Sequence, residues 1–209
     1  MLGNGDHQIT SSWTDEDDVA EIETTIGITR SNITFLGKGI DTTTILGGFG
    51  IDNVENITFK NMTVTNTSED GTGICMMNAK VELINVALNG RNGAAFYTPP
   101  YTSETTVVVA TRCEFSNSNF GAVVQGSLTS ATFKNCVFND NSEDGIYGDR
   151  STIHLHGEAT AIHSNGEHGI RAIDSGKVVI HLPSNHNTIY NNGTDRYTYA
   201  GATITNVED

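Results

Sequence analysis

The chain has 209 residues, and its 25 Asp and Glu outnumber its 11 Lys and Arg, so the formal net charge at pH 7 is −14. This charge would repel a nucleic-acid backbone or an anionic membrane surface, and we expect neither as a partner. A neutral glycan, a basic protein or a cation is compatible with it. The sequence contains no apolar run of membrane-spanning length and no signal-peptide pattern, so it leaves the localisation open.

The composition is typical of a β-rich protein, with 22 Gly, only 3 Pro and 17% charged residues. Three cysteines, Cys75, Cys113 and Cys136, show no C-x-x-C spacing. They predict reduced, buried thiols rather than a zinc site or a disulfide framework. No cofactor motif is recognisable, and we expect no cofactor.

Residues 1–32 are predicted to form an N-terminal cap and an imperfect first coil. Trp13, with the acidic residues 15–18, is expected to form a charged cap over the end of the core. The inward-facing candidates in this segment are Ile9, Val19, Ile22, Ile26 and Ile28.

From residue 33 to 203 the chain divides into successive repeat segments, here called lines, whose first residues are similar, as in a repeat protein. By subtraction of their starting positions the lines are 22 to 26 residues long, and they begin at Ile33, Ile57, Val81, Val107, Ala131, Ile153 and Val178. Polar or small residues mostly flank an apolar third residue, which predicts a strand with one face inward. These third residues are Phe35, Phe59, Leu83, Val109, Phe133, Leu155 and Ile180.

A second pattern recurs later in the lines, where an asparagine precedes a glycine by four residues. Asparagine tolerates left-handed backbone geometry and bonds locally, so stacked copies could turn each coil and form a ladder. The pairs are Asn89 with Gly93, Asn117 with Gly121, Asn141 with Gly145, and Asn165 with Gly169.

These repeats predict an all-β fold, a single-stranded right-handed parallel β-helix of about seven to eight coils of 22–26 residues each. We expect one domain over 1–209, with regular coils at 33–203 and a final strand at 204–209. Leucine-rich repeats would need a dense Leu and Asn consensus, and helical repeats would need a 3.6-residue period; both patterns are missing. A β-sandwich would have shorter spacing between its strands and no similarity from line to line. The last strand carries no evident cap, so this end is open to a homo-oligomer contact or an adjoining domain.

Two groups of residues are able to do chemistry. Asp144 and His168 precede the repeated glycines, and Tyr147 and Arg171 follow them by two residues. Together they offer a carboxylate, an imidazole, a phenol and a guanidinium on adjacent rungs, a set that could neutralise a uronate and move its α-proton. The alternative interpretation is that they are turn and ladder residues.

The second group is an outward column of Lys134, His156 and His181, which we predict as binding residues on the sheet surface. Two stacked histidines could hold a metal ion, but a third ligand at the right height is not evident, and we predict no metal site. Inward, Cys113 and Cys136 are expected to stack as an apolar thiol pair, with a disulfide as the alternative.

The lines FKNCVFNDNSEDGIYG and IHLHGEATAIHSNGEHGIRAIDSGKVVIHLPSNHNT resemble right-handed β-helix repeat proteins of the pectate-lyase-like superfamily. More narrowly, they resemble repeat modules encoded by protists, algae and their large viruses, where a similar I-H-L-P-S-x-H-N-T ending recurs. The resemblance implies the fold but not the chemistry, because this superfold serves lyases, hydrolases, esterases, adhesins and scaffolds.

The sequence therefore favours a non-catalytic β-helix module that presents a rigid sheet surface to a protein or polysaccharide partner. The alternative is a uronate polysaccharide lyase or epimerase, with Tyr147 or His168 as acid or base and Arg171 on the uronate. In residue types the candidate set resembles mannuronan epimerases, yet the Asp-Pro-His motif is missing, as are the clustered aspartates of calcium-dependent pectate lyases. The loop 97–106 is the expected wall of any groove. Ice or mineral binding would need threonines repeated on one face, which residues 42–44 do not provide.

Overall fold

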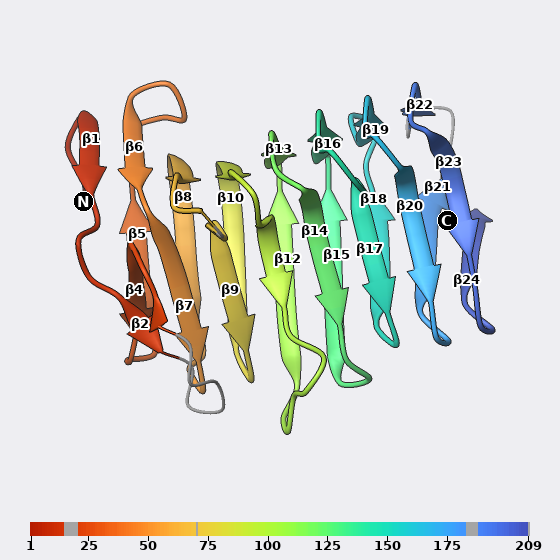
Figure 1. Cartoon of the computed structure of the whole chain (residues 1–209), viewed down its shortest axis with the longest axis horizontal. Coiled ribbons are helices and arrows are strands. Elements are labelled where there is room, and N and C mark those ends of the chain that lie inside the picture. Colours follow the sequence, from red (N-terminus) through yellow and green to blue (C-terminus); the bar gives the residue numbers. More distant parts are fainter. Residues whose placement is uncertain (15–20, 70, 183–187, 209) are drawn as a thin grey trace.

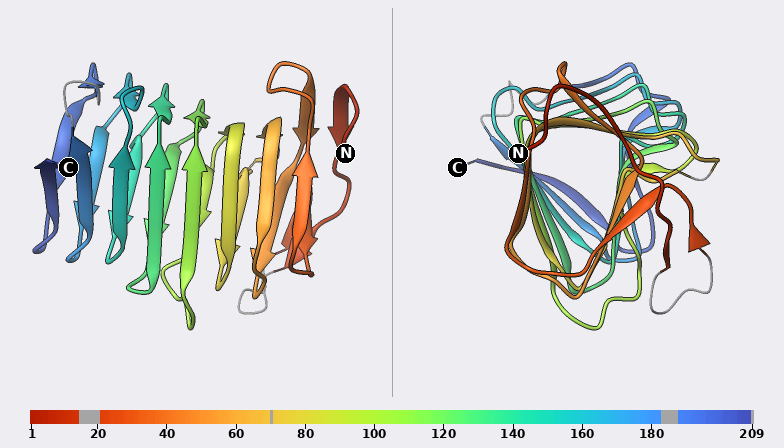
Figure 2. Two further views of the ribbon diagram at one scale, coloured as in Figure 1. Left: turned by 180° about the vertical axis from the view of Figure 1, so that it is seen from behind. Right: turned by 90° about the vertical axis from the view of Figure 1, so that its left-hand side faces the viewer.

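The computed structural model describes residues 1–14, 21–69, 71–182 and 188–208. Within them every regular element is a strand, and the strands wind around one long axis in stacked coils (Figure 1). The view along that axis in Figure 2 shows the coils superposed. The side view in Figure 1 shows the two ends of the chain at opposite ends of the stack. No described segment forms an apolar helix long enough to cross a membrane.

The coils have three faces, and parallel pairing between equivalent strands builds each face. The first face contains β12 (Thr106–Thr111), β15 (Thr129–Lys134), β18 (Thr152–His156), β21 (Lys177–Leu182) and β24 (Thr203–Glu208). The second contains β13 (Glu114–Ser116), β16 (Val137–Asn139), β19 (Ala161–His163) and β22 (Thr188–Tyr190). The third contains β4 (Thr25–Ile28), β7 (Gly48–Asp52), β9 (Ile74–Met77), β11 (Ala94–Thr98), β14 (Phe120–Gln125), β17 (Ile146–Asp149), β20 (His168–Ile173) and β23 (Thr194–Thr198).

Earlier in the chain the first two faces are joined by long strands. The strands β8 (Ile57–Asn66) and β10 (Lys80–Gly90) run through both faces. In front of them, β5 (Ile33–Leu36) and β6 (Thr43–Leu46) pair with successive parts of β8, and β1 (Gly5–Gln8) pairs with β6. Only β2 (Trp13–Thr14) and β3 (Glu21–Ile22) pair antiparallel among the described strands. The predicted parallel β-helix is therefore confirmed.

The core fills the inside of the coils with side chains that repeat from rung to rung. On the first face Phe59, Leu83, Ala110, Phe133, Leu155 and Ile180 are in register. The Phe115 and Phe138 rings stack with centroids 4.7 Å apart. Burying each such large side chain contributes roughly 1.5–3 kcal/mol, which makes this apolar column the main source of stability.

The assignment of Val109 to this column was wrong. Ala110 pairs with Leu83 on one side and Phe133 on the other, and Val109 is 37% exposed. The insertion between β11 and β12 delays the strand by one residue. Because side chains alternate along a strand, this shift exchanges inward and outward positions.

Left-handed backbone geometry turns the corners of each coil. At the corner between the first and second faces, φ is 55° at Asn61, 53° at Asn85, 54° at Arg112 and 54° at Asn135. Asparagine tolerates this geometry better than most residues, and three of these four corner residues are asparagines. At the next corner the left-handed residues are Asn117, Asp140, Ser164 and Asn191.

Inside that second corner, a ladder of buried side chains runs along the axis. Asn141 donates from Nδ2 to Asn165 Oδ1 at 2.9 Å, and Asn165 donates likewise to Asn192 at 2.8 Å. Each amide also donates to a main-chain carbonyl of the preceding coil. The expected ladder therefore exists at Asn141 and Asn165.

The two earlier members of the predicted ladder were wrong. Asn117 is exposed at the left-handed corner, and the buried Ser118 takes the ladder position, where its main-chain N donates to Asn141 Oδ1. In the preceding coil Gly90 takes the ladder position, because its main-chain N–H donates to Ser118 Oγ, and Asn89 lies one residue before it. Ser118 is three positions before Gly121, not four, so counting back four from the glycine selects the wrong residue in that coil.

The N-terminal segment also differs from expectation. Trp13 lies on the outer surface of the third face, against Gly27 and Gly50, and does not cover the end of the core. Ile26 pairs with the buried Phe49 and shares the inward side of β4 with the buried Ile28, as expected, but it is 38% exposed because β4 is the end strand of this face. Ile9 packs against the core. The acidic residues 15–18 and Val19 lie outside the described residues, as does the side chain of Ile22.

Candidate functional site

One outward column of the third face contains three tyrosines. Its members occupy successive rungs in exact pairing register and so lie in a line along the axis. They are Gly27, Gly50, Cys75, Tyr97, Val123, Tyr147, Arg171 and Tyr197. The aromatic column is the name we use for the part from Tyr97 to Tyr197.

An open hollow of about 490 Å³ follows the aromatic column. Its floor includes Tyr97, Val123, Tyr147 and Arg171, and its edges are formed by Thr72, Asn92, Gly93, Ala94, Phe120 and Gln125. The lining thus combines flat apolar rings with a few hydrogen-bonding groups, a combination common in ligand sites.

Arg171 is held in place by its neighbours on the adjacent rungs. Its guanidinium carbon lies 5.4 Å from the centre of the Tyr147 ring and 5.8 Å from that of Tyr197. Both distances allow cation–π attraction. Burial raises the pKa of the Tyr147 phenol, so this side chain is neutral at ordinary pH and can donate a hydrogen bond.

Beside Arg171 lies the pair of Asp144 and His168. Asp144 Oδ1 is 2.7 Å from His168 Nδ1, and Asp144 Oδ2 is 3.8 Å from Arg171 Nη1. The Asp144 side chain is fully buried, and that of His168 is 18% exposed. Burial raises the pKa of Asp144, although His168 and Arg171 oppose the rise. The carboxylate therefore orients the imidazole, leaving His168 Nε2 as its reactive nitrogen.

This cluster also retains unused polar atoms. Asp144 Oδ2 and Arg171 Nε are buried and make no hydrogen bond among the described residues. Glu167 adds another carboxylate, so that one ligand atom from each of Asp144, Glu167 and His168 lies within 4.8 Å of the others. The group could accept a cation, but Asp144 is already engaged with His168.

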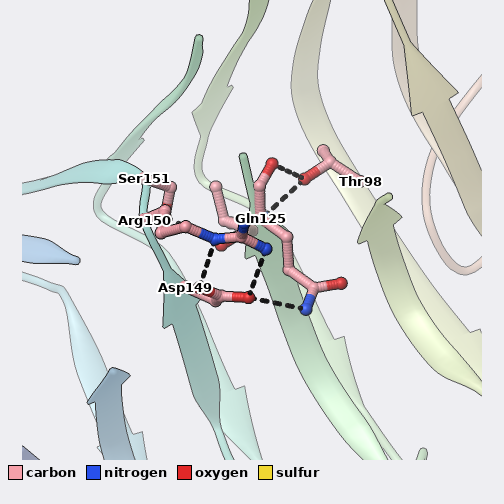
Figure 3. A network of polar contacts seen from close by, with 6 residues as sticks. Thr98, Gln125, Asp149, Arg150 and Ser151 are labelled. Carbon is pink, nitrogen blue, oxygen red and sulfur yellow. Dashed lines mark hydrogen bonds and ion pairs between the residues drawn. The ribbon is translucent and has the colours of Figure 1, made fainter. Parts of the chain in front are cut away.

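A polar network fixes the edge of the hollow at Gln125 (Figure 3). The main-chain N of Gln125 donates to Thr98 Oγ1 at 2.8 Å, and its Nε2 donates to Asp149 Oδ2 at 3.4 Å. Arg150 Nε donates to Asp149 Oδ1 at 3.0 Å. These bonds orient the Gln125 amide before any ligand arrives, which lowers the entropy lost on binding.

The predicted binding residues Lys134, His156 and His181 share one outward column of the first face. Lys134 pairs with His156, and the rings of His156 and His181 stack with centroids 3.8 Å apart. A third imidazole, His154, places Nδ1 at 2.9 Å from His181 Nε2. Burial and the neighbouring His181 lower the pKa of His154.

The structure thus brings Asp144, Tyr147, His168 and Arg171 together and separates them from the histidines of the first face. Sequence reasoning missed Phe120, Gln125, Tyr197 and His154. Tyr197 falls in the column of Tyr147 and Arg171, but Asp195 replaces the glycine that marks the earlier coils. His154 had a usable signal, because residues two apart on a strand share a face.

The expected wall of the groove is present only in part. Tyr97 lines the hollow, as expected for the start of loop 97–106. Pro100 and Thr102 instead lie against Gly126, at the corner that follows β14. The loop therefore shields that corner, and Asn92 and Gly93 edge the hollow on its N-terminal side.

The three-faced coils and their aligned columns define a parallel β-helix protein. Residues 47–208 match the family model described as the right-handed β-helix region, and the chain belongs to this family. Neither the curated proteins nor the solved structures contain a match to the chain. Family membership fixes the architecture, whereas partner and chemistry must be argued from the residues.

Proposed function

We propose that the chain is a non-catalytic β-helix module that binds a neutral carbohydrate chain along the aromatic column. The observation that carries the proposal is the hollow of about 490 Å³ over Tyr97, Tyr147 and Arg171. Rungs are about 4.8 Å apart, so the two tyrosines, two rungs from each other, are separated by roughly 9.6 Å along the axis. An extended glycan could lie along this line and contact both rings.

The surroundings favour a neutral ligand over an acidic one. Desolvation raises the pKa of Glu143, and the neighbouring carboxylates of Glu167 and Asp144 raise it further. Arg171 is the positive group within the lining, and the chain as a whole carries −14. A polyanion would therefore meet net repulsion, whereas sugar hydroxyls could bond to Gln125 and Arg171.

Carbohydrate is favoured over protein because the hollow is small and its polar groups are fixed in advance. A stable protein interface buries about 800 Å² on each partner, usually around apolar anchors. The floor here offers ring faces and hydrogen-bonding groups on a rigid sheet, and the Thr98 and Asp149 bonds orient Gln125. These features suit the mixed apolar and polar faces of a sugar ring.

The proposal is tested by titrating the full chain with cellohexaose, laminarihexaose, xylohexaose and mannohexaose in a calorimeter. At least one should bind, and Tyr147→Ala should weaken it about tenfold, equivalent to about 1.4 kcal/mol, because the ring face is lost. Tyr101→Ala is the matched control, since Tyr101 is 81% exposed outside the hollow. The proposal fails if none of the four sugars binds, or if the Tyr147 variant binds as well as the unaltered chain.

A uronate lyase or epimerase is a second candidate, favoured by the Asp144–His168 contact of 2.7 Å beside Arg171. His168 would accept the α-proton through Nε2, Asp144 would orient the ring, and Arg171 would pair with the uronate carboxylate. Neither Asp144 nor His168 lines the hollow, however, which favours the binding module.

The enzyme candidate is separable by experiment. A lyase would form unsaturated uronate from alginate or pectate, with a new ultraviolet absorbance, and His168→Ala would abolish it. An epimerase would change the uronate composition without that absorbance, as read by NMR. If neither product forms in the presence of the folded chain, the enzyme candidate is excluded.

A further inference from the structure

Three histidines gather on the first face, away from the carbohydrate hollow. His154 and His156 stand two residues apart on β18 and therefore on the same side of the strand. His181 lies on the neighbouring β21 and stacks on His156. All three side chains are partly exposed, so an ion from solution could reach them.

The ring nitrogens of these residues converge. One nitrogen from each ring lies within 4.8 Å of the others, and His154 Nδ1 is 2.9 Å from His181 Nε2. Zinc–nitrogen bonds of about 2.0–2.1 Å place the nitrogens of a tetrahedral site roughly 3.3 Å apart. One present separation is slightly below that value and none of the three exceeds 4.8 Å, so side-chain rotations can close the site while the backbone stays in place.

We propose that His154, His156 and His181 bind a divalent transition-metal ion, with Zn²⁺ as the best fit. Neutral imidazole is a preferred ligand of Zn²⁺, Cu²⁺ and Ni²⁺, whereas Mg²⁺ and Ca²⁺ require oxygen donors. Three protein ligands leave a fourth position on the solvent side for water or an added ligand. The proposal stands apart from the carbohydrate site, since the two use different faces of the coil.

Metal binding requires one change in protonation. A hydrogen bond between His154 Nδ1 and His181 Nε2 needs a proton on one of these two nitrogens. That proton moves to the other nitrogen of the same ring by way of solvent, and both facing nitrogens then offer lone pairs. The rings stay neutral, so no oxidant, reductant or net proton transfer is involved.

The residues around the three histidines influence which fourth ligand the metal ion would take. Lys134 precedes His156 in the same column, and Thr132 precedes His154. The ammonium group opposes a free cation, but it favours an anionic group as the fourth ligand of the ion. Sheet geometry sets the two strands a fixed distance apart, so the three nitrogens are held together without a flexible loop.

The test uses the full chain prepared without a polyhistidine tag, titrated with ZnCl₂ in a calorimeter and with CoCl₂ in an absorption spectrometer. We expect one Zn²⁺ per chain and the visible bands of tetrahedral Co²⁺. His154→Thr and His181→Thr should each weaken Zn²⁺ binding at least about tenfold, since two imidazoles remain. Threonine suits the sheet, as Thr132 in the His154 column indicates.

His163→Thr is the matched control, because His163 is also partly exposed but lies on the second face beside Tyr190. It should bind Zn²⁺ as the unaltered chain does. Equal Zn²⁺ binding by the His154 and His181 variants would overturn the proposal, as would absence of Zn²⁺ binding or of tetrahedral Co²⁺ bands in the unaltered chain. The Co²⁺ spectrum needs no variant, so a folding defect in one of them cannot hide the answer.

Discussion

The same outward column of the third face has different residues in the two halves of the molecule. In the N-terminal half the column offers Gly27 and Gly50, and Trp13 lies directly on them. In the C-terminal half it offers Tyr97, Tyr147 and Tyr197, and the open hollow lies over the first two of them. A glycine column binds a side chain of its own protein, whereas an aromatic column is available to an external ligand.

The corners show a related difference. In the N-terminal half Asn66 accepts hydrogen bonds from Ser68 and Thr24, and Gly90 occupies the next rung. In the C-terminal half Asn141, Asn165 and Asn192 bond to one another across three rungs. Continuous amide bonding aligns the coils that carry Tyr147, Arg171 and Tyr197, the C-terminal part of the aromatic column.

Breaking the amide ladder should have the largest effect. Asn165→Ala removes two donated bonds and leaves the main-chain N–H of Asn141 without its side-chain acceptor. Each unsatisfied buried group costs about 1–3 kcal/mol, so the free energy of unfolding should fall by about 3 kcal/mol. Urea unfolding followed by circular dichroism measures the change.

The matched control for the ladder is Asn56→Gly. Asn56 bonds to Asn32 at an exposed corner and has a φ of 59°, which glycine adopts without strain. Its loss should change the free energy of unfolding by less than about 1 kcal/mol. Similar losses in the two variants would contradict a special role for the buried ladder.

The tryptophan contact in the N-terminal half should give an intermediate effect. A Cβ atom at Gly50 would overlap the Trp13 ring, so Gly50→Ala must displace the indole. We expect a loss of about 2 kcal/mol in the free energy of unfolding. Because Trp13 is the one tryptophan of the chain, its emission should also shift to longer wavelength.

Gly3→Ala is the control for this change, since nothing lies within 4 Å of a Cβ atom added there. Its emission and stability should match those of the unaltered chain. Unchanged emission from Gly50→Ala would mean that Trp13 does not occupy the glycine column in solution.

The smallest effect should be a pH dependence at Asp144. Burial raises its pKa in the folded state, so its contribution to stability is present below the unfolded pKa of about 3.9 and is lost as pH rises through the folded value. Asp144→Asn keeps an acceptor for the His168 main-chain N–H and removes this loss. The stability of the variant relative to the unaltered chain should therefore increase from pH 4 to pH 7.

Denaturant unfolding at both pH values measures this difference, with the exposed Asp140→Asn as the control variant. Asp140 has a φ of 55°, which asparagine tolerates, so the control adds no backbone strain. A difference that is the same at both pH values would contradict the direction given for Asp144.

Much of this site could be predicted because the coils repeat. Counting along the lines placed Asp144 beside His168 and Tyr147 beside Arg171, and the pairing register agrees. It also aligned Cys113 with Cys136, which are both buried and free. A period close to one coil turns spacing in sequence directly into neighbours in space.

The remainder depended on features that spacing does not encode. Whether the surface above a column is open depends on where a distant segment lies, as Trp13 on Gly50 illustrates. Small changes in coil length moved Ser118 and Ala110 into positions assigned to Asn117 and Val109. His154 was not predicted because equivalent positions were compared between lines, whereas His154 and His156 are neighbours along the same strand, β18.

The loop between β11 and β12 has a practical consequence for protein engineering. The strand β12 pairs in continuous register with β10 and β15, although the intervening loop lengthens its coil. Doubling the length of a flexible loop costs only about 0.6 kcal/mol of closure entropy. The position is therefore suited to carry a grafted peptide or reporter, displayed at one chosen height along a rigid rod.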